Sequence, residues 1–450
     1  MLALRLTRRS HPAVQLRRLL VAVASAGTGF LLLCTLGYAM GHPDSPAAAA
    51  LRLAWCATPL AATVYFAVAV ARTDPATKPR PGLSAIGLGP GRLMAISATT
   101  TALACTLGSM LALLFFLHLR GDLTGMPFDG AAAEFLASDT PLPLPAALTL
   151  LAIVPATASV SVALTLRPKD TSPKGAPRSY GRFGAYGRSG TRETFGTYGR
   201  FGAHLRTGSR RTEVEETPAP APEPAADAEP TATVTGPVDL DPTRPPAPRE
   251  VPKGLPWGVA VLAAGLAVEA YANRTADTDG LSMPGGHAGG PAGVLAGWVL
   301  TALGLALAGP GLTHLCGRLL QAVRPGALRL LAGRVLMEEA TRIGRPLGVV
   351  CAVASGAYAM TALYDTDAAV GPLTTLGTLL VTGCTVATLL TAAVEARQAR
   401  ADTTAALVRL GAPATVLRSA AALRAGALLA LFVPLTVVIA ELAALPLAHR

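Results

Sequence analysis

The sequence predicts an all-α membrane protein that crosses the bilayer several times. Hydrophobic residues make up 51% of the chain and charged residues only 14%, whereas soluble domains usually carry about 25% charged residues. Several apolar runs continue for about 20 residues without a charge, enough to cross a hydrocarbon core roughly 30 Å thick. Lipid offers no partner to a free amide or carbonyl, so each span is expected to be a helix. A soluble Ala-rich helical protein is the alternative.

Nine apolar runs are candidate transmembrane helices. The first run follows two Arg clusters, exceeds the length of a signal-peptide core and lacks a convincing cleavage site, so we expect it to remain as a span. The six cysteines lie in or beside these runs without metal-ligand spacing and are expected to be buried thiols. The predicted spans are residues 19–40, 53–71, 93–117, 145–166, 255–271, 292–312, 346–363, 372–394 and 419–441.

The distribution of Lys and Arg predicts that the N-terminus is cytoplasmic. With that orientation, 33 of the 38 basic residues fall in the inner segments and four fall in the outer ones. Without the long inner segment 167–254 the ratio is still 19 to 4. Cytoplasmic loops carry this excess in membrane proteins, so we expect a multi-pass protein of the plasma membrane. The outer loops are too short for a folded domain.

Residues 167–254 differ in composition from the rest of the chain. The first half repeats YGRFGAYGRSG and YGRFGAH, and the second half, EVEETPAPAPEPAADAEP, is acidic and rich in Pro. Neither half can bury enough apolar surface to offset chain entropy, so we expect a disordered cytoplasmic linker. Arg beside Tyr and Phe can bind RNA, but a solvated tether that is attracted to anionic lipid headgroups is the favoured interpretation. No specific nucleic acid is expected.

Three short matches in the same order indicate an internal repeat around this linker. ALRL at residue 3 recurs at 327, and AVASAG at 22 recurs as AVASGA at 352. LSAIGLGPGRL at 83 recurs as LVRLGAPATVL at 407, which aligns Gly89 with Gly411. Both copies enter the membrane in the same direction, as in transporters whose halves are parallel repeats. Residues 328–336 have an amphipathic pattern that fits a helix lying along the inner interface, with continuation of a neighbouring helix as the alternative.

The predicted organisation therefore has four parts. Residues 1–166 form a first repeat of about four spans, and 167–254 form the linker. Residues 255–312 form two connecting spans, and 313–450 form a second repeat of about three spans.

The cytoplasmic segment L-x-x-L-G-A after the second span of a repeat, with ALRL before the first span, resembles the FtsX-like permease family of ABC transporters. The family implies that this segment is a short helix docked onto a separate cytoplasmic ATPase. It also implies that ATP binds to that partner and that this chain holds no cofactor. Homo- or hetero-oligomers and contact with membrane lipids are expected. The resemblance maps the coupling segments onto Leu83, Leu88, Gly89 and Arg92 in the first repeat and Leu407, Arg409, Leu410, Gly411 and Ala412 in the second.

The residues of the second segment give this expectation a physical basis. Gly411 is expected to end a short helix whose apolar side, Leu407 and Leu410, meets a partner. Arg397, Arg400 and Arg409 are expected to border that contact and attract an acidic surface. The alternative is that Gly411 only lets the loop turn and that the Arg residues only fix the topology. The chain departs from the family in three ways: Pro81 and Thr403 replace an early Glu, there is no large extracytoplasmic domain, and the second half lacks a fourth span.

Two other functions remain possible from the sequence. The chain has no GxxxxGK[ST], HExxH or GxSxG motif, and we expect neither catalytic nor metal-binding residues. An ion-gradient-driven transporter would require a buried carboxylate or helices broken at Pro310 or Pro434, and a non-transporting scaffold is also compatible. The ionisable residues within or beside spans are each expected to be an interfacial anchor or a partly solvated member of a pair: Glu269, Glu441, Arg424, His118 and His314.

Overall fold

The computed structural model describes residues 12–74, 90–123, 130–167, 252, 254–275, 281–283, 287–290, 292–322, 326–363 and 371–448. The chain divides into two compact units, residues 1–169 with 249–450, and residues 170–248. All described residues belong to the first unit. Apart from its ends, the predicted linker lies outside the described residues.

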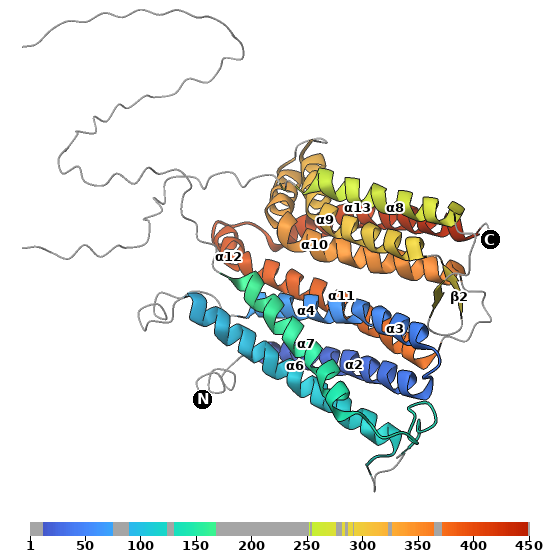
Figure 1. Ribbon diagram of the computed structural model, residues 1–450. Helices are drawn as coiled ribbons and strands as arrows, with labels where there is room; N and C mark the ends of the chain where they lie inside the picture. Colours follow the sequence, from blue (N-terminus) through green and yellow to red (C-terminus); the bar gives the residue numbers. More distant parts are fainter. Residues whose placement is uncertain are drawn as a thin grey trace, which may run out of the picture. The chain divides into compact units, whose positions relative to one another are not determined.

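The first unit is built from helices (Figure 1). Among the described residues, eight helical segments are long and apolar enough to cross a membrane, with mean hydropathy between 1.5 and 2.3. These segments confirm the prediction of an all-α protein with many spans. The helices are α2 (Pro12–Gly41), α3 (Pro46–Trp55), α4 (Ala57–Thr73), α6 (Pro90–Arg120), α7 (Leu144–Leu166), α8 (Leu255–Thr275), α9 (Ala292–Ala322), α10 (Ala327–Leu363), α11 (Pro372–Ala399), α12 (Ala401–Arg409) and α13 (Ala414–Ala448).

The long helix α10 contains the predicted span 346–363, but is not one of the eight apolar segments. Its first half is rich in Arg and Glu, and it continues without interruption into the predicted span. The expectation of a separate interfacial helix over residues 328–336 was therefore wrong. Ala332 and Leu336 are buried, and a Cβ added to Gly333 would lie 2.6 Å from the carbonyl oxygen of Gly317 on α9. Packing against α9 thus accounts for the amphipathic pattern.

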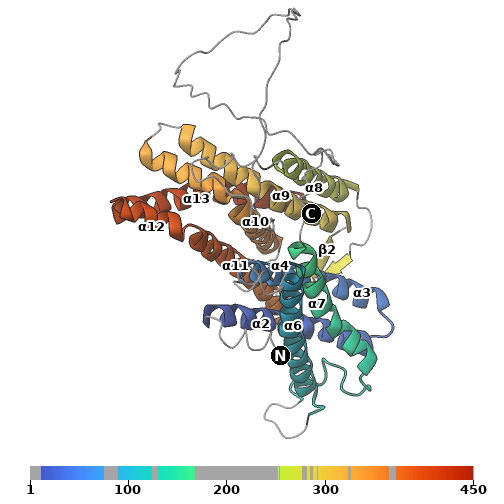
Figure 2. The ribbon, with the colours of Figure 1, turned by 90° about the vertical axis from the view of Figure 1, so that its left-hand side faces the viewer.

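Successive long helices alternate in direction. Helices α2 and α4 are antiparallel, because Arg18 pairs with Asp74 at one end and Thr28 Oγ1 lies 2.9 Å from Thr63 Oγ1 further along. Helices α8, α9 and α10 lie side by side with α9 antiparallel to both neighbours (Figure 2). Alternation of this kind is what a chain must have if each helix crosses the bilayer once.

Helices α4 and α11 join the two predicted repeats and are parallel. Cys56 packs in one cluster with Leu373 and Leu376, and Phe66 packs with Cys384 further along both helices. Thr63 Oγ1 lies 3.9 Å from Cys384 Sγ. The connections that follow α4 and α11 therefore leave the helices at the same end. We call it the basic end because Arg17, Arg18, Arg397 and Arg400 lie there, and we call the opposite end the hairpin end.

The hairpin end carries a short antiparallel pair of strands, which was expected only as a loop. Strand β1 (Leu281–Met283) pairs with β2 (His287–Gly290), with Leu281 opposite Gly290. Pro-Gly-Gly stands between the two strands in the sequence, and such residues favour tight turns. The pair lies in the connection between α8 and α9.

Neither proline that an ion-gradient-driven transporter could use as a helix break interrupts its helix, since α9 continues through Pro310 and α13 continues through Pro434. The glycines beside Pro310 instead allow close approach of other helices. A Cβ on Gly309 would lie 2.1 Å from the carbonyl oxygen of Gly344, and one on Gly311 would lie 2.5 Å from Leu255 Cβ. Small residues at such crossings let helix backbones approach closely in membranes.

Candidate functional site

The segment predicted to contact a partner contains a short helix, α12, between α11 and α13 (Figure 1). Asp402 lies in its first turn and Arg409 in its last turn, so both charges complement the helix dipole. Residues 402, 405 and 409 share one side at helical spacing, whereas Leu407 and Leu410 lie on the other. The helix therefore has a polar side and an apolar side.

The predicted end of this helix at Gly411 is confirmed. Gly411 has φ = 87°, and its N–H donates to the carbonyl oxygen of Val408 at 3.0 Å. The N–H of Ala412 donates to the carbonyl oxygen of Leu407, also at 3.0 Å. These two bonds form a Schellman motif, which requires a left-handed residue where glycine carries no penalty. The Leu-Gly pair thus ends the helix and turns the chain toward α13.

Helix α12 is strongly exposed. None of its nine residues is buried, and the side chain of Leu410 is 84% exposed. Isolated helices shorter than about 12 residues are marginal in water, and its packing against α11 is slight. An exposed apolar side on a helix at the basic end is the kind of surface that partner grooves recognise.

The predicted coupling residues divide into described and undescribed groups. In the second segment Leu407 and Ala412 are half-buried, and Arg409 is exposed. In the first segment Arg92 is exposed on the first turn of α6. Leu83, Leu88 and Gly89 lie outside the described residues. The structure therefore places the connections after α4 and after α11 at the same end of the molecule. We call these connections the first and the second joint, and residues 75–89 of the first joint lie outside the described residues.

Arg400 links α12 to the remainder of the second half. It follows α11 directly and precedes the first residue of α12. Its Nε lies 2.6 Å from Oε1 of Glu339 on α10 and donates to the carbonyl oxygen of Ala396 at 3.0 Å. Glu339 is buried. Burial raises the pKa of Glu339, while the guanidinium groups of Arg400, Arg424 and Arg342 act in the opposite direction.

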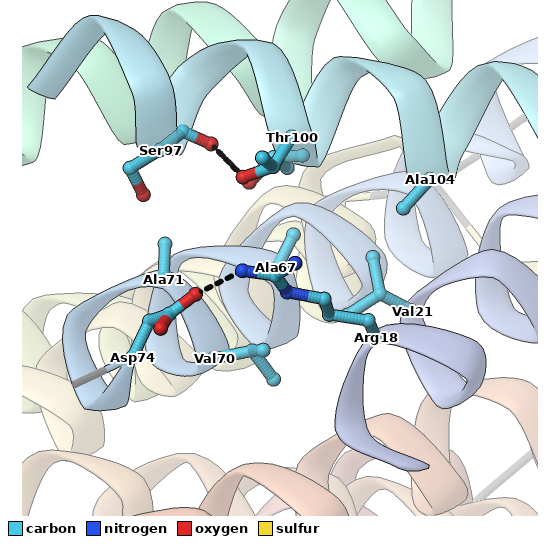
Figure 3. Close-up of a pocket in the computed structure, with 10 residues that line it drawn as sticks. Arg18, Val21, Ala67, Val70, Ala71, Asp74, Ser97, Thr100 and Ala104 are labelled. Atoms are coloured by element: carbon cyan, nitrogen blue, oxygen red, sulfur yellow. Dashed lines mark hydrogen bonds and ion pairs between the residues drawn. The ribbon is translucent and has the colours of Figure 1, made fainter. Parts of the chain in front are cut away.

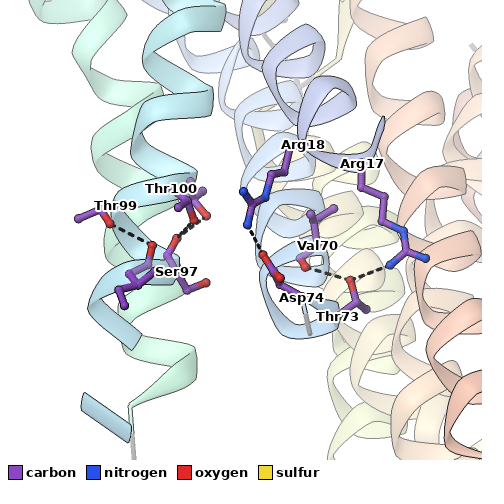
Figure 4. A network of polar contacts seen from close by, with 10 residues as sticks. Arg17, Arg18, Val70, Thr73, Asp74, Ser97, Thr99 and Thr100 are labelled. Atoms are coloured by element: carbon purple, nitrogen blue, oxygen red, sulfur yellow. Dashed lines mark hydrogen bonds and ion pairs between the residues drawn. The ribbon is translucent and has the colours of Figure 1, made fainter. Parts of the chain in front are cut away.

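The first half contains an ion pair at the corresponding place. Arg18 of α2 pairs with Asp74, which follows α4 directly (Figure 3). The neighbouring Arg17 donates from Nη1 to Thr73 Oγ1 at 3.3 Å (Figure 4). Ser97 and Thr100 of α6 line the same small pocket as this pair.

In both halves, then, a charge on the first helix of the half (α2 or α10) meets an opposite charge directly after its second helix (α4 or α11). The first half places the base on the first helix and the second half places the acid there. The sequence reasoning did not identify either pair. One signal was available: Asp74 is the only acidic residue in the segment 72–92, which carries four basic residues.

One intramembrane carboxyl does not lie where it was expected. Glu269 was predicted to be an interfacial anchor or a partly solvated member of a pair, but it is fully buried between α8 and α9, and Trp298 Nε1 donates to its Oε1 at 2.8 Å. The signal that could have placed it is Gly265, which lies one turn earlier on the same side of α8 and permits close approach of α9. Glu441, in contrast, is exposed and accepts a hydrogen bond from Tyr358 Oη at 2.7 Å.

These features define a polytopic all-α membrane protein with an exposed short helix at its basic end. No family model, curated protein or solved structure matches the chain.

Proposed function

We propose that the chain is the membrane-spanning permease subunit of an ABC transporter. In this proposal a separate cytoplasmic ATPase binds the joint between α11 and α13, and ATP hydrolysis on that partner drives export of a substrate or a conformational change across the plasma membrane. The observation that carries the proposal is α12, whose apolar side is exposed beside a fixed turn at Gly411.

The basic end is the cytoplasmic side in this proposal. The bias of Lys and Arg supports that orientation. The parallel arrangement of α4 and α11 supports a second ATPase contact, because the connection over residues 75–89 leaves the helices at the same end as α12. A pair of ATPase subunits could then contact both joints from one side of the membrane.

The contacts of Arg400 provide a route from α12 to the spans. A force on α12 reaches α11 and α13 through the chain itself. The same force reaches α10 through the ion pair of Arg400 and Glu339, whose Nε and Oε1 atoms are 2.6 Å apart. Because Gly411 fixes the exit of α12 by two backbone hydrogen bonds, the helix can transmit displacement as a rigid element.

The test uses the full chain, tagged and purified with its native partners from gently solubilised membranes. We expect recovery of a protein that carries a GxxxxGK[ST] phosphate-binding loop, and we expect Leu410→Asp or Gly411→Pro to abolish that recovery. Ala405→Asp is the matched control, because it adds the same charge on the opposite, exposed side of α12 and is expected to leave recovery intact. Equal recovery with Leu410→Asp and Ala405→Asp would refute docking at this joint.

Glu269 favours a second candidate function, an ion-gradient-driven transporter, because buried intramembrane carboxyls often serve ion pathways. Vesicles that contain the purified chain distinguish the two functions. Substrate movement driven by a proton gradient without any ATPase favours the second candidate, and movement that requires the ATPase and ATP favours the first.

A further inference from the structure

The helices α8 and α9 enclose a carboxyl group in an apolar environment. They approach so closely that a Cβ on Gly297 would lie 2.8 Å from Glu269 Cβ. A Cβ on Gly265 would lie 2.5 Å from Thr301 Oγ1. The side chain of Glu269 has no exposed surface. The helix pair is therefore closely packed at Glu269 and one turn before it on α8.

The hydrogen bonding of this carboxyl is incomplete. Its Oε1 accepts from Trp298, but its Oε2 is buried and has no hydrogen-bond partner in the described part of the chain. Thr301 Oγ1, one turn further along α9, is also buried without a partner there. A buried carboxylate with a single donor is costly, whereas a neutral carboxyl avoids most of that cost.

The charged groups of the neighbouring elements do not compensate a negative charge here. On α9, His314 and Arg318 lie toward the opposite end of the helix from Trp298. On α13, which also contacts α8, Glu441 lies toward the hairpin end and is held by Tyr358 of α10. On α8 itself, Arg274 is exposed.

We propose that Glu269 is a proton-binding site in the α8–α9 helix pair, protonated while the two helices are closed and deprotonated when their hairpin end opens to water. The proposal does not depend on the ATPase-coupled function, since Glu269 and Trp298 lie in the two connecting spans, 255–271 and 292–312, outside both predicted repeats. It gives the connecting helices a role of their own, because the proton on Glu269 favours the closed pair.

A proton fits this site better than a metal cation does. Hard cations such as Ca²⁺ take six or more oxygen ligands, and the described residues contain no cluster of three His, Cys, Asp or Glu side chains that could hold a metal ion. A proton needs only one oxygen lone pair, and Oε2 provides it.

The test is labelling of the full chain, in detergent micelles or lipid nanodiscs, with the hydrophobic reagent dicyclohexylcarbodiimide across a pH series. The protonated carboxyl transfers its proton to a carbodiimide nitrogen while its oxygen bonds to the central carbon. Migration of the acyl group to nitrogen then leaves a stable N-acylurea, whose mass marks the labelled peptide. We expect labelling of Glu269 in the native chain with a midpoint at higher pH than labelling of the same residue in the denatured chain.

Variants sharpen the test. Trp298→Phe removes the donor that favours the ionised form, so the midpoint of Glu269 labelling should move to higher pH. Gly297→Ala should force the helices apart at Glu269, admit water and move the midpoint to lower pH. Gly304→Ala is the matched control, because its Cβ would lie 2.5 Å from the nitrogen of Leu262, two turns from Glu269, and the midpoint should stay.

Three results would overturn the proposal. The first is labelling of Glu269 in the native chain that does not change with pH. The second is a midpoint equal to that of Glu269 in the denatured chain. The third is protection of Glu269 by Na⁺ or K⁺ at constant pH, which would identify a monovalent cation as the ligand. The chain without substitutions suffices for the first two results, so the test stands even where a variant does not fold.

Discussion

The two halves of the molecule use the same layout at the basic end but exchange the charges. In the first half Arg18 on α2 meets Asp74 after α4, and in the second half Glu339 on α10 meets Arg400 after α11. The surroundings differ too, since Ser97 and Thr100 face the first pair whereas Arg424 lies near the second. The same arrangement of helices is thus compatible with either order of the two charges.

The exchange has a physical consequence for how the halves assemble. Helix α11 contacts both α2 and α4, so α2 has two second helices, α4 and α11, within reach. An exchanged pairing would place Arg18 beside Arg400 and Asp74 beside Glu339, which are like charges. Like charges at a packed contact are strongly disfavoured. The charge order therefore favours pairing of each first helix with the second helix of its own half.

The largest expected effect concerns the sidedness of the two joints. Leu88→Cys and Leu410→Cys, each in a chain that keeps its six native cysteines, should react with a membrane-impermeant thiol reagent from the same side, because α4 and α11 are parallel. The native cysteines are buried and serve as the background. Ala137→Cys, on the segment that follows α6 at the hairpin end, should react only from the other side. Labelling of the two joints from opposite sides would contradict the fold.

The next largest effect is expected for Glu339→Arg. It would place a third guanidinium group beside Arg400 and Arg424, and breaking a buried pair costs about 3 kcal/mol or more. Thermal unfolding in detergent should show the loss. The exchanged variant Glu339→Arg with Arg400→Glu should recover only part of it, because Arg424 keeps its sign. Full recovery would show that Arg424 does not contribute to the site.

A smaller effect is expected for Asp74→Ala than for Glu339→Arg, because it removes one charge of the pair without placing a like charge beside Arg18. A loss of about 1–2 kcal/mol is expected. The exchanged variant Arg18→Asp with Asp74→Arg should recover most of it, since hydroxyl groups face the pair. If this exchanged variant recovers no more stability than Glu339→Arg with Arg400→Glu does, the surroundings of the two ion pairs do not differ in their effect.

The smallest effect is expected for Gly411→Ala. The added Cβ meets no atom within 4 Å, so the cost is only that of a left-handed backbone, about 1 kcal/mol. Hydrogen exchange of the α12 amides should become faster. Gly426→Ala is the control, because its Cβ also meets nothing and its φ is not positive. Gly89→Ala then tests whether Gly89 also has a left-handed backbone. A loss of stability similar to that of Gly411→Ala would indicate that it does.

Much of the fold could be predicted from the apolar runs. Eight of the nine predicted spans fall within a single helix of the structure, and the ninth crosses the junction of α3 and α4 at Cys56. The end of α12 could be predicted because a Leu-Gly pair after an amphipathic segment is a strong local signal. The repeat itself and the ATPase contact stay predictions.

Other features depend on tertiary contacts that the sequence does not display. Pro310 looked like a helix break, but the glycines beside it allow close packing that keeps α9 continuous. The charged first half of α10 looked like a surface helix, but it packs against the end of α9. In spans composed mainly of Ala, Leu, Val and Gly, the side that faces a neighbour carries little signal, so the burial of Glu269 was not foreseen.

The parallel contact of α4 and α11 means that the two joints are not mechanically independent. Both helices end at the same side and share a seam that includes Thr63 and Cys384. Because the two helices pack together there, displacement of either one at its joint must change its contacts with the other.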